Sequence, residues 1–240
     1  MEEENIFFHL PLLGYFLLGK RENMNKSILK MTTLALLSAV GVILMSYLQI
    51  PYPIAPFLKI ELSDFVVMFT FLLFGLKEAS IVALLKTGCD LILRGPEAGG
   101  SYPFVAHLTA LIASFTYIFA LWLVNKIIKK DRIEHKIVKY SLVVITVSVI
   151  MTLANYTILT PLFLGDFSFF GIGASEGTLG ALSGITGVDS FFLGIVILYM
   201  PFNLLKASLI SIVAVSTGDT LLEVYRRKFK VKDSRYEQIT

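Results

Sequence analysis

The amino-acid sequence predicts an all-α integral membrane protein with six transmembrane helices. Apolar residues make up 55% of the 240 residues and charged residues only 16%, and the mean hydropathy is +0.75. These values lie well outside the average of soluble proteins. The apolar residues are also gathered into long stretches with short basic runs between them, which is typical of a chain that crosses a bilayer repeatedly. We therefore expect a multi-pass protein of the cell membrane, in contact with the lipid bilayer.

Six apolar stretches are expected to form the membrane helices, because about 20 apolar residues are needed to cross a bilayer as a helix. They cover residues 32–48, 62–74, 79–93, 102–124, 138–159 and 191–215. The second and third are short and only four residues separate them, which predicts a helical hairpin. The sixth contains Pro201, so a break in this helix is one expectation.

Three further segments lie outside these helices. Residues 1–23 carry acids where a signal peptide would have bases, and their apolar stretch is too short to span a membrane, so they are expected to be a disordered or interfacial leader. The membrane domain then covers residues 24–230, and residues 231–240 form a cytoplasmic tail. The loop between Leu162 and Ser190 contains seven glycines, which argue against a continuous helix there.

The basic residues predict the orientation, because cytoplasmic segments retain Lys and Arg. If both termini are cytoplasmic, 17 of the 21 basic residues lie on the cytoplasmic side and only Lys59 and Arg94 lie in outer loops. The remaining two, Lys86 and Lys206, fall inside apolar stretches. We expect both termini in the cytoplasm.

Composition and missing motifs exclude several classes of protein. A net charge of only +3 does not indicate nucleic-acid binding. The single cysteine, Cys89, forms no internal disulfide, and no cysteine and histidine cluster has the spacing of a zinc site. The sequence also has no phosphate-binding loop and no common hydrolase motif. We therefore expect no catalytic residues, no metal and no cofactor.

The loops expected on the outer side hold most of the proline and glycine of the chain, together with six acids: Glu61, Asp64, Glu97, Asp166, Glu176 and Asp189. Irregular backbone at membrane depth is tolerated only where it is buried in protein or lines a cavity. This composition therefore predicts a cavity that opens to the outer face.

Polar residues inside the apolar stretches are candidates for that cavity, because an ionisable group in a membrane is costly and usually functional. Lys206 follows Asn203 by three residues, which places both on one helix face. Asn155 is expected at a similar depth in the fifth helix. Two amides and a cation could bind a polar heteroaromatic ring. In the alternative interpretation, the amides bond neighbouring helices and Lys206 pairs with an acid such as Asp64.

Two other polar residues inside the apolar stretches have open roles. Lys86 could bind a ligand, extend its ammonium group to the membrane surface, or pair with Asp90 one turn later. His107 is better explained by a hydrogen bond between helices than by ligand binding. An intramembrane enzyme could use Asp64, Asp90 or His107, although the sequence shows no acid and base pair at catalytic spacing.

A stripe of small residues marks the first helix. Ala35 and Ala39 stand four residues apart, with Ser38 near the same face, and such a pattern allows another helix to approach closely. The partner could be another protein or a helix of the same bundle.

Three segments together resemble one transporter family. Residues 57–64 (FLKIELSD) resemble its K-I-D-F-S-D stretch, residues 154–161 (ANYTILTP) its N-Y-x-x-x-x-P, and residues 201–206 (PFNLLK) its P-F-N-x-x-K. The family is that of the riboflavin-specific substrate-binding (S) components of energy-coupling factor (ECF) transporters, the RibU family. The three motifs occur in the family's order, and the resemblance covers roughly residues 26–227.

This resemblance implies a six-helix S-component fold whose site, near the outer face, is closed by the loop between the first two helices. It implies riboflavin as the transported ligand, with Asn155 and Lys206 on its ring. The other candidates for ligand binding are Asn203, Asp64, Glu61 and Lys59. A different vitamin, such as pantothenate or a pterin, remains an alternative.

The resemblance also implies partner proteins. They are a transmembrane coupling subunit, which would contact Ala35 and Ala39, and two cytoplasmic ATPase subunits. The sequence departs from the family pattern at His107 and Thr87, where asparagine is expected, and in the longer loop from Leu162 to Ser190.

Overall fold

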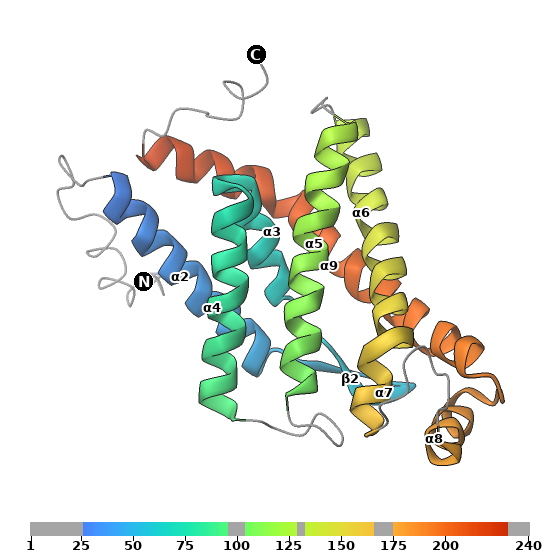
Figure 1. The fold of residues 1–240 in the computed structure, drawn as a ribbon. Coiled ribbons are helices and arrows are strands. Elements are labelled where there is room, and N and C mark those ends of the chain that lie inside the picture. Colours follow the sequence, from blue (N-terminus) through green and yellow to red (C-terminus); the bar gives the residue numbers. More distant parts are fainter. Residues whose placement is uncertain (1–25, 96–103, 129–132, 166–174, 230–240) are drawn as a thin grey trace, which may run out of the picture.

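The computed structural model describes residues 26–95, 104–128, 133–165 and 175–229, so the expected leader (1–23) and tail (231–240) lie outside the described residues. The described chain is mostly helical, with one small β-hairpin (Figure 1). The elements are α2 (Lys26–Tyr47), β1 (Ile50–Tyr52), β2 (Ala55–Ile60), α3 (Ser63–Phe74), α4 (Leu76–Arg94), α5 (Val105–Ile127), α6 (Ile133–Ala154), the π-helix η1 (Asn155–Leu159), α7 (Thr160–Leu164), α8 (Glu176–Thr186) and α9 (Phe191–Phe229).

Four of these helices are long and apolar enough to cross a membrane, in the segments Ser27–Tyr47, Val105–Ile127, His135–Leu164 and Phe191–Gly218. They confirm a membrane protein with several apolar helices. The expected hairpin of α3 and α4 is present, and the two helices meet at Gly75, whose φ of 97° is readily adopted only by glycine. α3 is shorter than the four spans, and α4 carries several charges, so the count of six spans stays a prediction.

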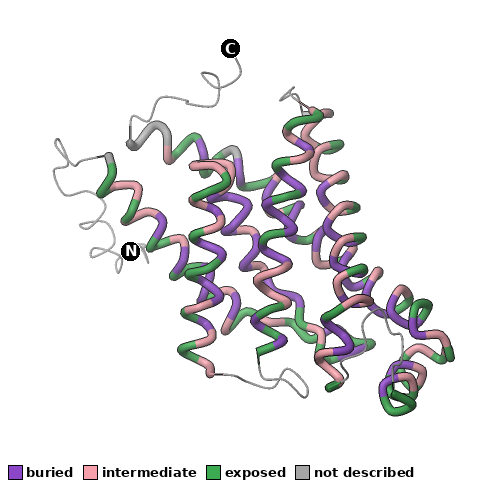
Figure 2. The backbone as a smooth tube through the Cα atoms, viewed as in Figure 1, coloured by how far each residue is buried: buried purple, intermediate pink, exposed green. Residues whose placement is uncertain are grey.

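The helices place the ends of the described chain on one side of the bundle. In Figure 1, the start of α2, the α3–α4 turn, the neighbouring ends of α5 and α6 and the end of α9 all lie toward the top. The β-hairpin, α7 and α8 lie toward the bottom. Figure 2 shows buried residues mainly where helices face one another. Large apolar side chains such as Ile43, Ile145 and Ile212 are exposed, as lipid-facing residues of a membrane bundle would be.

The segment between α2 and α3 folds as an antiparallel hairpin, a small β element that the all-α prediction missed. Ile50 pairs with Ile60 and Pro51 with Lys59, and the register shifts between Pro51 and Tyr52. The hairpin is anchored because Tyr52 meets Phe202 of α9 edge to face, with ring centroids 5.4 Å apart. Residues of both strands thus join an apolar cluster with the first half of α9.

A helix also forms inside the glycine-rich loop, contrary to the expectation from its seven glycines. Ser175 begins α8 by accepting a hydrogen bond from the backbone N–H of Thr178 at 3.2 Å. The buried Leu182 packs against Gly194 of α9 so closely that a Cβ on this glycine would lie 2.7 Å from Leu182 Cδ2. Packing onto α9 therefore outweighs the low helix propensity of glycine.

The last helix is continuous. α9 passes through Pro201 without a break, although proline removes one backbone hydrogen bond from a helix interior. Its middle part packs on α6, with Ala207 and Ile210 fully buried in the largest apolar cluster of the described chain. The polar face that begins two residues after Pro201 is therefore held on a rigid element.

Candidate ligand-binding site

A cavity of about 290 Å³ lies among the ends of the helices near the β-hairpin. Residues of α2, β2, α4, α5, α6, η1, α7 and α9 line it. Its aliphatic lining residues are Met45, Leu58, Val105, Ala106, Ala110, Ala113, Val147, Met151 and Leu159. The volume is at the lower end of the range of small-molecule sites, about 300 to 1,000 Å³, and such sites are mostly apolar with few polar groups.

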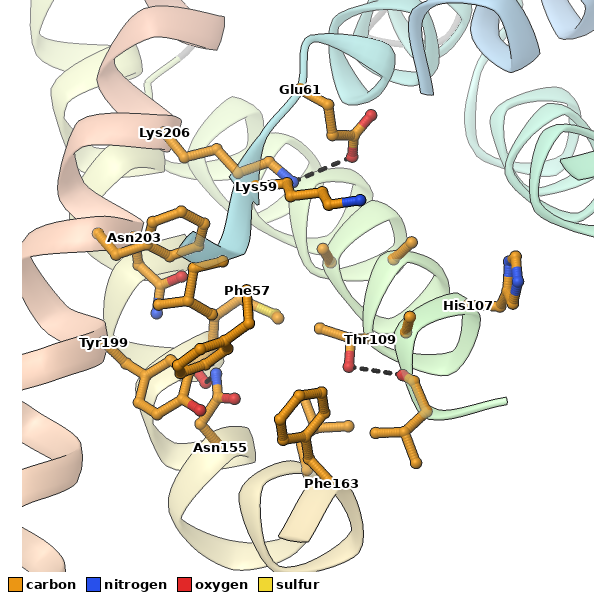
Figure 3. A pocket seen from close by; sticks show the side chains of 18 of the residues that line it. Phe57, Lys59, Glu61, His107, Thr109, Asn155, Phe163, Tyr199, Asn203 and Lys206 are labelled. Carbon is orange, nitrogen blue, oxygen red and sulfur yellow. Dashed lines mark hydrogen bonds and ion pairs between the residues drawn. The ribbon is translucent and has the colours of Figure 1, made fainter. Parts of the chain in front are cut away.

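The cavity brings together five of the six residues that the sequence predicted for ligand binding. Asn155, Asn203, Lys206, Glu61 and Lys59 all line it (Figure 3). The sixth, Asp64, is completely buried and does not line the cavity. Three elements far apart in the sequence, β2, η1 and α9, thus converge on one space.

The two amides line the cavity from η1 and α9. Asn155 begins the π-helix, and its Nδ2 donates to the carbonyl oxygen of Met151 at 2.8 Å. Asn203 Nδ2 lies 3.2 Å from Thr152 Oγ1 on α6, which partly agrees with the alternative role of bonding neighbouring helices. Both hydrogen bonds use the NH₂ group, so the carbonyl oxygen of each amide can still accept a hydrogen bond from a ligand. π-bulges are frequent at functional sites, and no feature of the sequence predicted this one.

Lys206 is a cation with its counter-ions in place. Its Nζ lies 3.1 Å from Glu61 Oε1 and 3.5 Å from Asp64 Oδ2. Figure 3 marks the pair with Glu61 by a dashed line. The ion pair with Asp64, which the alternative interpretation of the sequence expected, is present, and Lys206 also lines the cavity. Lys206 therefore faces the cavity while its charge is compensated from the end of the hairpin and from α3.

Asp64 connects the cavity to a second buried lysine. Lys86 Nζ donates to Asp64 Oδ1 at 2.7 Å and to Ser63 Oγ at 2.5 Å, and Ser114 Oγ of α5 donates to Asp64 Oδ1 at 2.6 Å. Lys86 and Asp64 are fully buried. The pair of Lys86 with Asp90 on the same helix, one of the roles left open by the sequence, does not form. Lys86 instead bridges α4 to α3.

Asp90 anchors another polar cluster at the cavity wall. It accepts hydrogen bonds from Ser46 Oγ of α2 at 2.5 Å and from Arg94 Nε at 2.8 Å, and Arg94 Nη2 completes a two-point contact. His107 of α5 lies with Nδ1 3.3 Å from Asp90 and with Nε2 3.2 Å from the carbonyl oxygen of Gly95. The expected bond of His107 between helices is present. Arg94 and His107 also line the cavity, which sequence reasoning missed.

Aromatic side chains form much of the remaining wall, and the sequence did not identify them. Phe57 of β2 stacks on Phe163 of α7, with ring centroids 5.4 Å apart and planes inclined by 27°. Tyr199 lies near Asn155 in Figure 3, and Tyr117 and Phe202 complete the aromatic set. Phe57 and Phe163 lie more than 100 positions apart in the sequence, so only the fold reveals their contact.

The small residues of α2 lie apart from the cavity. Ala35 and Ala39 are exposed, so the described chain does not cover them. Ser38, which the sequence placed near the same face, is buried in the bundle and donates to the carbonyl oxygen of Leu34 at 2.9 Å. The exposed face therefore consists of the two alanines without Ser38.

Comparisons with known proteins agree with this architecture. The model of the family described as "ECF transporter, substrate-specific component" matches residues 29–216. A solved structure, reported as "Structure and mechanism of the S component of a bacterial ECF transporter", superimposes with a TM-score of 0.61. It is 21% identical, and the match covers 83% of this chain and 99% of that chain, which shows a shared fold. No curated protein matches the chain.

Proposed function

The chain belongs to the family of substrate-specific components of ECF transporters, and we propose that the substrate it captures is riboflavin. The observation that carries this proposal is the pairing of two amides and a charge-compensated lysine with an aromatic wall in one cavity. Riboflavin has a flat ring with polar edges, and it is neutral at pH 7. A protein of this kind makes and breaks no bond in its ligand.

The side chains of the cavity wall support a flat heteroaromatic ligand. The aromatic set of the cavity offers ring faces and edges for stacking. The carbonyl groups of Asn155 and Asn203 can accept from ring N–H groups, and the Lys206 ammonium can donate to ring oxygen or nitrogen. Asn155 and Asn203 are each held by a hydrogen bond to α6, and Lys206 is held by its ion pair with Glu61 at the end of the hairpin, so little ordering would be needed on binding.

The charge balance supports a neutral ligand. Lys206 and Lys86 are balanced by Glu61 and Asp64, and Arg94 is balanced by Asp90. Among the described residues that line the cavity, Lys59 is then the one cation with no ion pair, and it lies exposed on β2. A ligand with several negative charges would find few uncompensated cations here.

We further propose that the cavity opens to the outside of the cell and that both termini are cytoplasmic. The distribution of basic residues supports this orientation. The substrate-specific component would then capture riboflavin outside. A coupling subunit bound at Ala35 and Ala39, together with two ATPase subunits, would drive its release inside.

Replacing Asn155 with alanine is expected to weaken riboflavin binding by more than about 1 kcal/mol, because a polar atom of the ring loses its buried partner. Lys206→Ala should cost at least as much for the same reason. Quenching of flavin fluorescence on titration of the purified protein measures both effects.

The matched control is Ser216→Ala on α9, whose hydroxyl bonds to its own helix outside the cavity. This variant should bind riboflavin as tightly as the unaltered protein. Wild-type affinity in both the Asn155 and the Lys206 variant would show that neither residue contacts the ring.

A further inference from the structure

The polar cluster around Asp90 lines the cavity apart from the amides. In Figure 3, His107 lies on the opposite side of the drawn side chains from Asn155 and Tyr199. Arg94 and Gln49 line the same cavity, and Ser46, three residues before Gln49, joins α2 to Asp90. The binding of a ring at Asn155, Asn203 and Lys206 makes no use of this cluster.

The cluster holds its guanidinium in a fixed position. Asp90 is fully buried, receives Nε and Nη2 of Arg94, and is fixed in turn by a hydrogen bond from Ser46 of α2, while Nδ1 of His107 from α5 lies 3.3 Å away. Within the part of the chain that the structure describes, this leaves Nη1 of Arg94 without a protein acceptor. Two N–H donors of a preorganised group are therefore available to a ligand.

Gln49 adds an acceptor beside this donor group. Its Nε2 donates to the carbonyl oxygen of Met45 at 2.5 Å, which fixes the amide and leaves its oxygen for the cavity. A hydroxyl group both donates and accepts, so it suits a wall that offers donors and an acceptor together. A phosphate would instead face the Gln49 oxygen and the Asp90 carboxylate, and Arg94 is already charge-compensated.

We propose that Arg94 and Gln49 form a second subsite that binds a hydroxyl-bearing tail of the ligand, with Asp90, Ser46 and His107 as positioning residues. This inference rests on the proposed function, because it assigns the ring of riboflavin to one end of the cavity and the hydroxylated chain to the other. It makes the tail a determinant of affinity.

The test compares riboflavin with lumiflavin, which has the same ring and a methyl group in place of the tail. The purified protein should bind riboflavin more tightly than lumiflavin. Arg94→Gln should weaken riboflavin binding about tenfold, and Gln49→Leu about fivefold, while lumiflavin binding changes by less than about twofold in each. Gln49→Leu leaves the ion pair of Asp90 intact, so it tests the subsite even if Arg94→Gln does not fold.

A matched control is Lys30→Gln, which removes the ion pair of Lys30 with Glu78 between the same two helices, α2 and α4, away from the cavity. It should leave the affinities for both flavins unchanged. Equal affinity of the unaltered protein for both flavins, equal weakening of both in the variants, or wild-type riboflavin binding in Gln49→Leu would each overturn the subsite. If the unaltered protein binds neither flavin, the proposed function fails, and the subsite fails with it.

Discussion

Replacing Lys86 with methionine is expected to lower the free energy of unfolding of the protein by about 3 to 5 kcal/mol, the cost of removing one partner of a buried ion pair. Lys86 and Asp64 are both fully buried, with 2.7 Å between Nζ and Oδ1. Without Lys86, Asp64 keeps only Ser114 and the longer contact with Lys206. Unfolding of the purified protein in detergent, followed by circular dichroism, measures the loss.

Two variants make this result specific. Lys86→Met combined with Asp64→Leu removes both charges and should recover most of the lost stability, because Lys206 still pairs with Glu61. Lys30→Gln breaks a partly exposed ion pair and should cost less than about 1 kcal/mol. A Lys86→Met protein as stable as the unaltered one would show that the buried pair does not stabilise the fold.

Bulky residues on the exposed face of α2 are expected to abolish vitamin uptake while leaving binding intact. Ala35 and Ala39 are exposed, and two tryptophans there would hold an approaching helix away and remove the packing contacts that drive association in lipid. Neither alanine lines the cavity. The variant that combines Ala35→Trp with Ala39→Trp is tested by vitamin uptake in cells that also produce the coupling and ATPase subunits. Co-purification of the variant with the coupling subunit is the second measurement.

The control for this experiment is Ile145→Trp, a large residue at an exposed position of α6. It should leave uptake at the rate of the unaltered protein. Normal uptake in the double tryptophan variant would refute the interface on α2. Loss of both riboflavin binding and vitamin uptake would indicate that the two alanines support the packing of the helix bundle itself.

The elements that the sequence predicted well are those whose signal is local. The long apolar stretches of α2, α5, α6 and α9 are visible in composition alone, and so are the intramembrane amides and lysines. The β-hairpin was missed because its short strands contain Pro51 and Pro56, which indicate irregular chain. α8 was missed because the Leu182 contact with Gly194 outweighs the propensity of its glycines.

The parts of the site that could not be predicted depend on contacts between distant segments. The i to i+4 spacing of Lys86 and Asp90 is compatible with an ion pair between them. The α3–α4 hairpin instead brings Asp64 next to Lys86, and Asp90 pairs with Arg94 one turn later. Phe57 and Phe163 meet only because β2 and α7 close on the same cavity. Such contacts leave no periodic pattern in one sequence.

The most direct test of riboflavin as the substrate is the absorption spectrum of the protein purified from cells grown with the vitamin. We expect flavin absorption bands at a stoichiometry near one per chain, and quenched flavin fluorescence when riboflavin is added to protein freed of ligand. A colourless protein that leaves the fluorescence of added riboflavin unchanged would contradict the assignment and show that this substrate-specific component takes a different ligand.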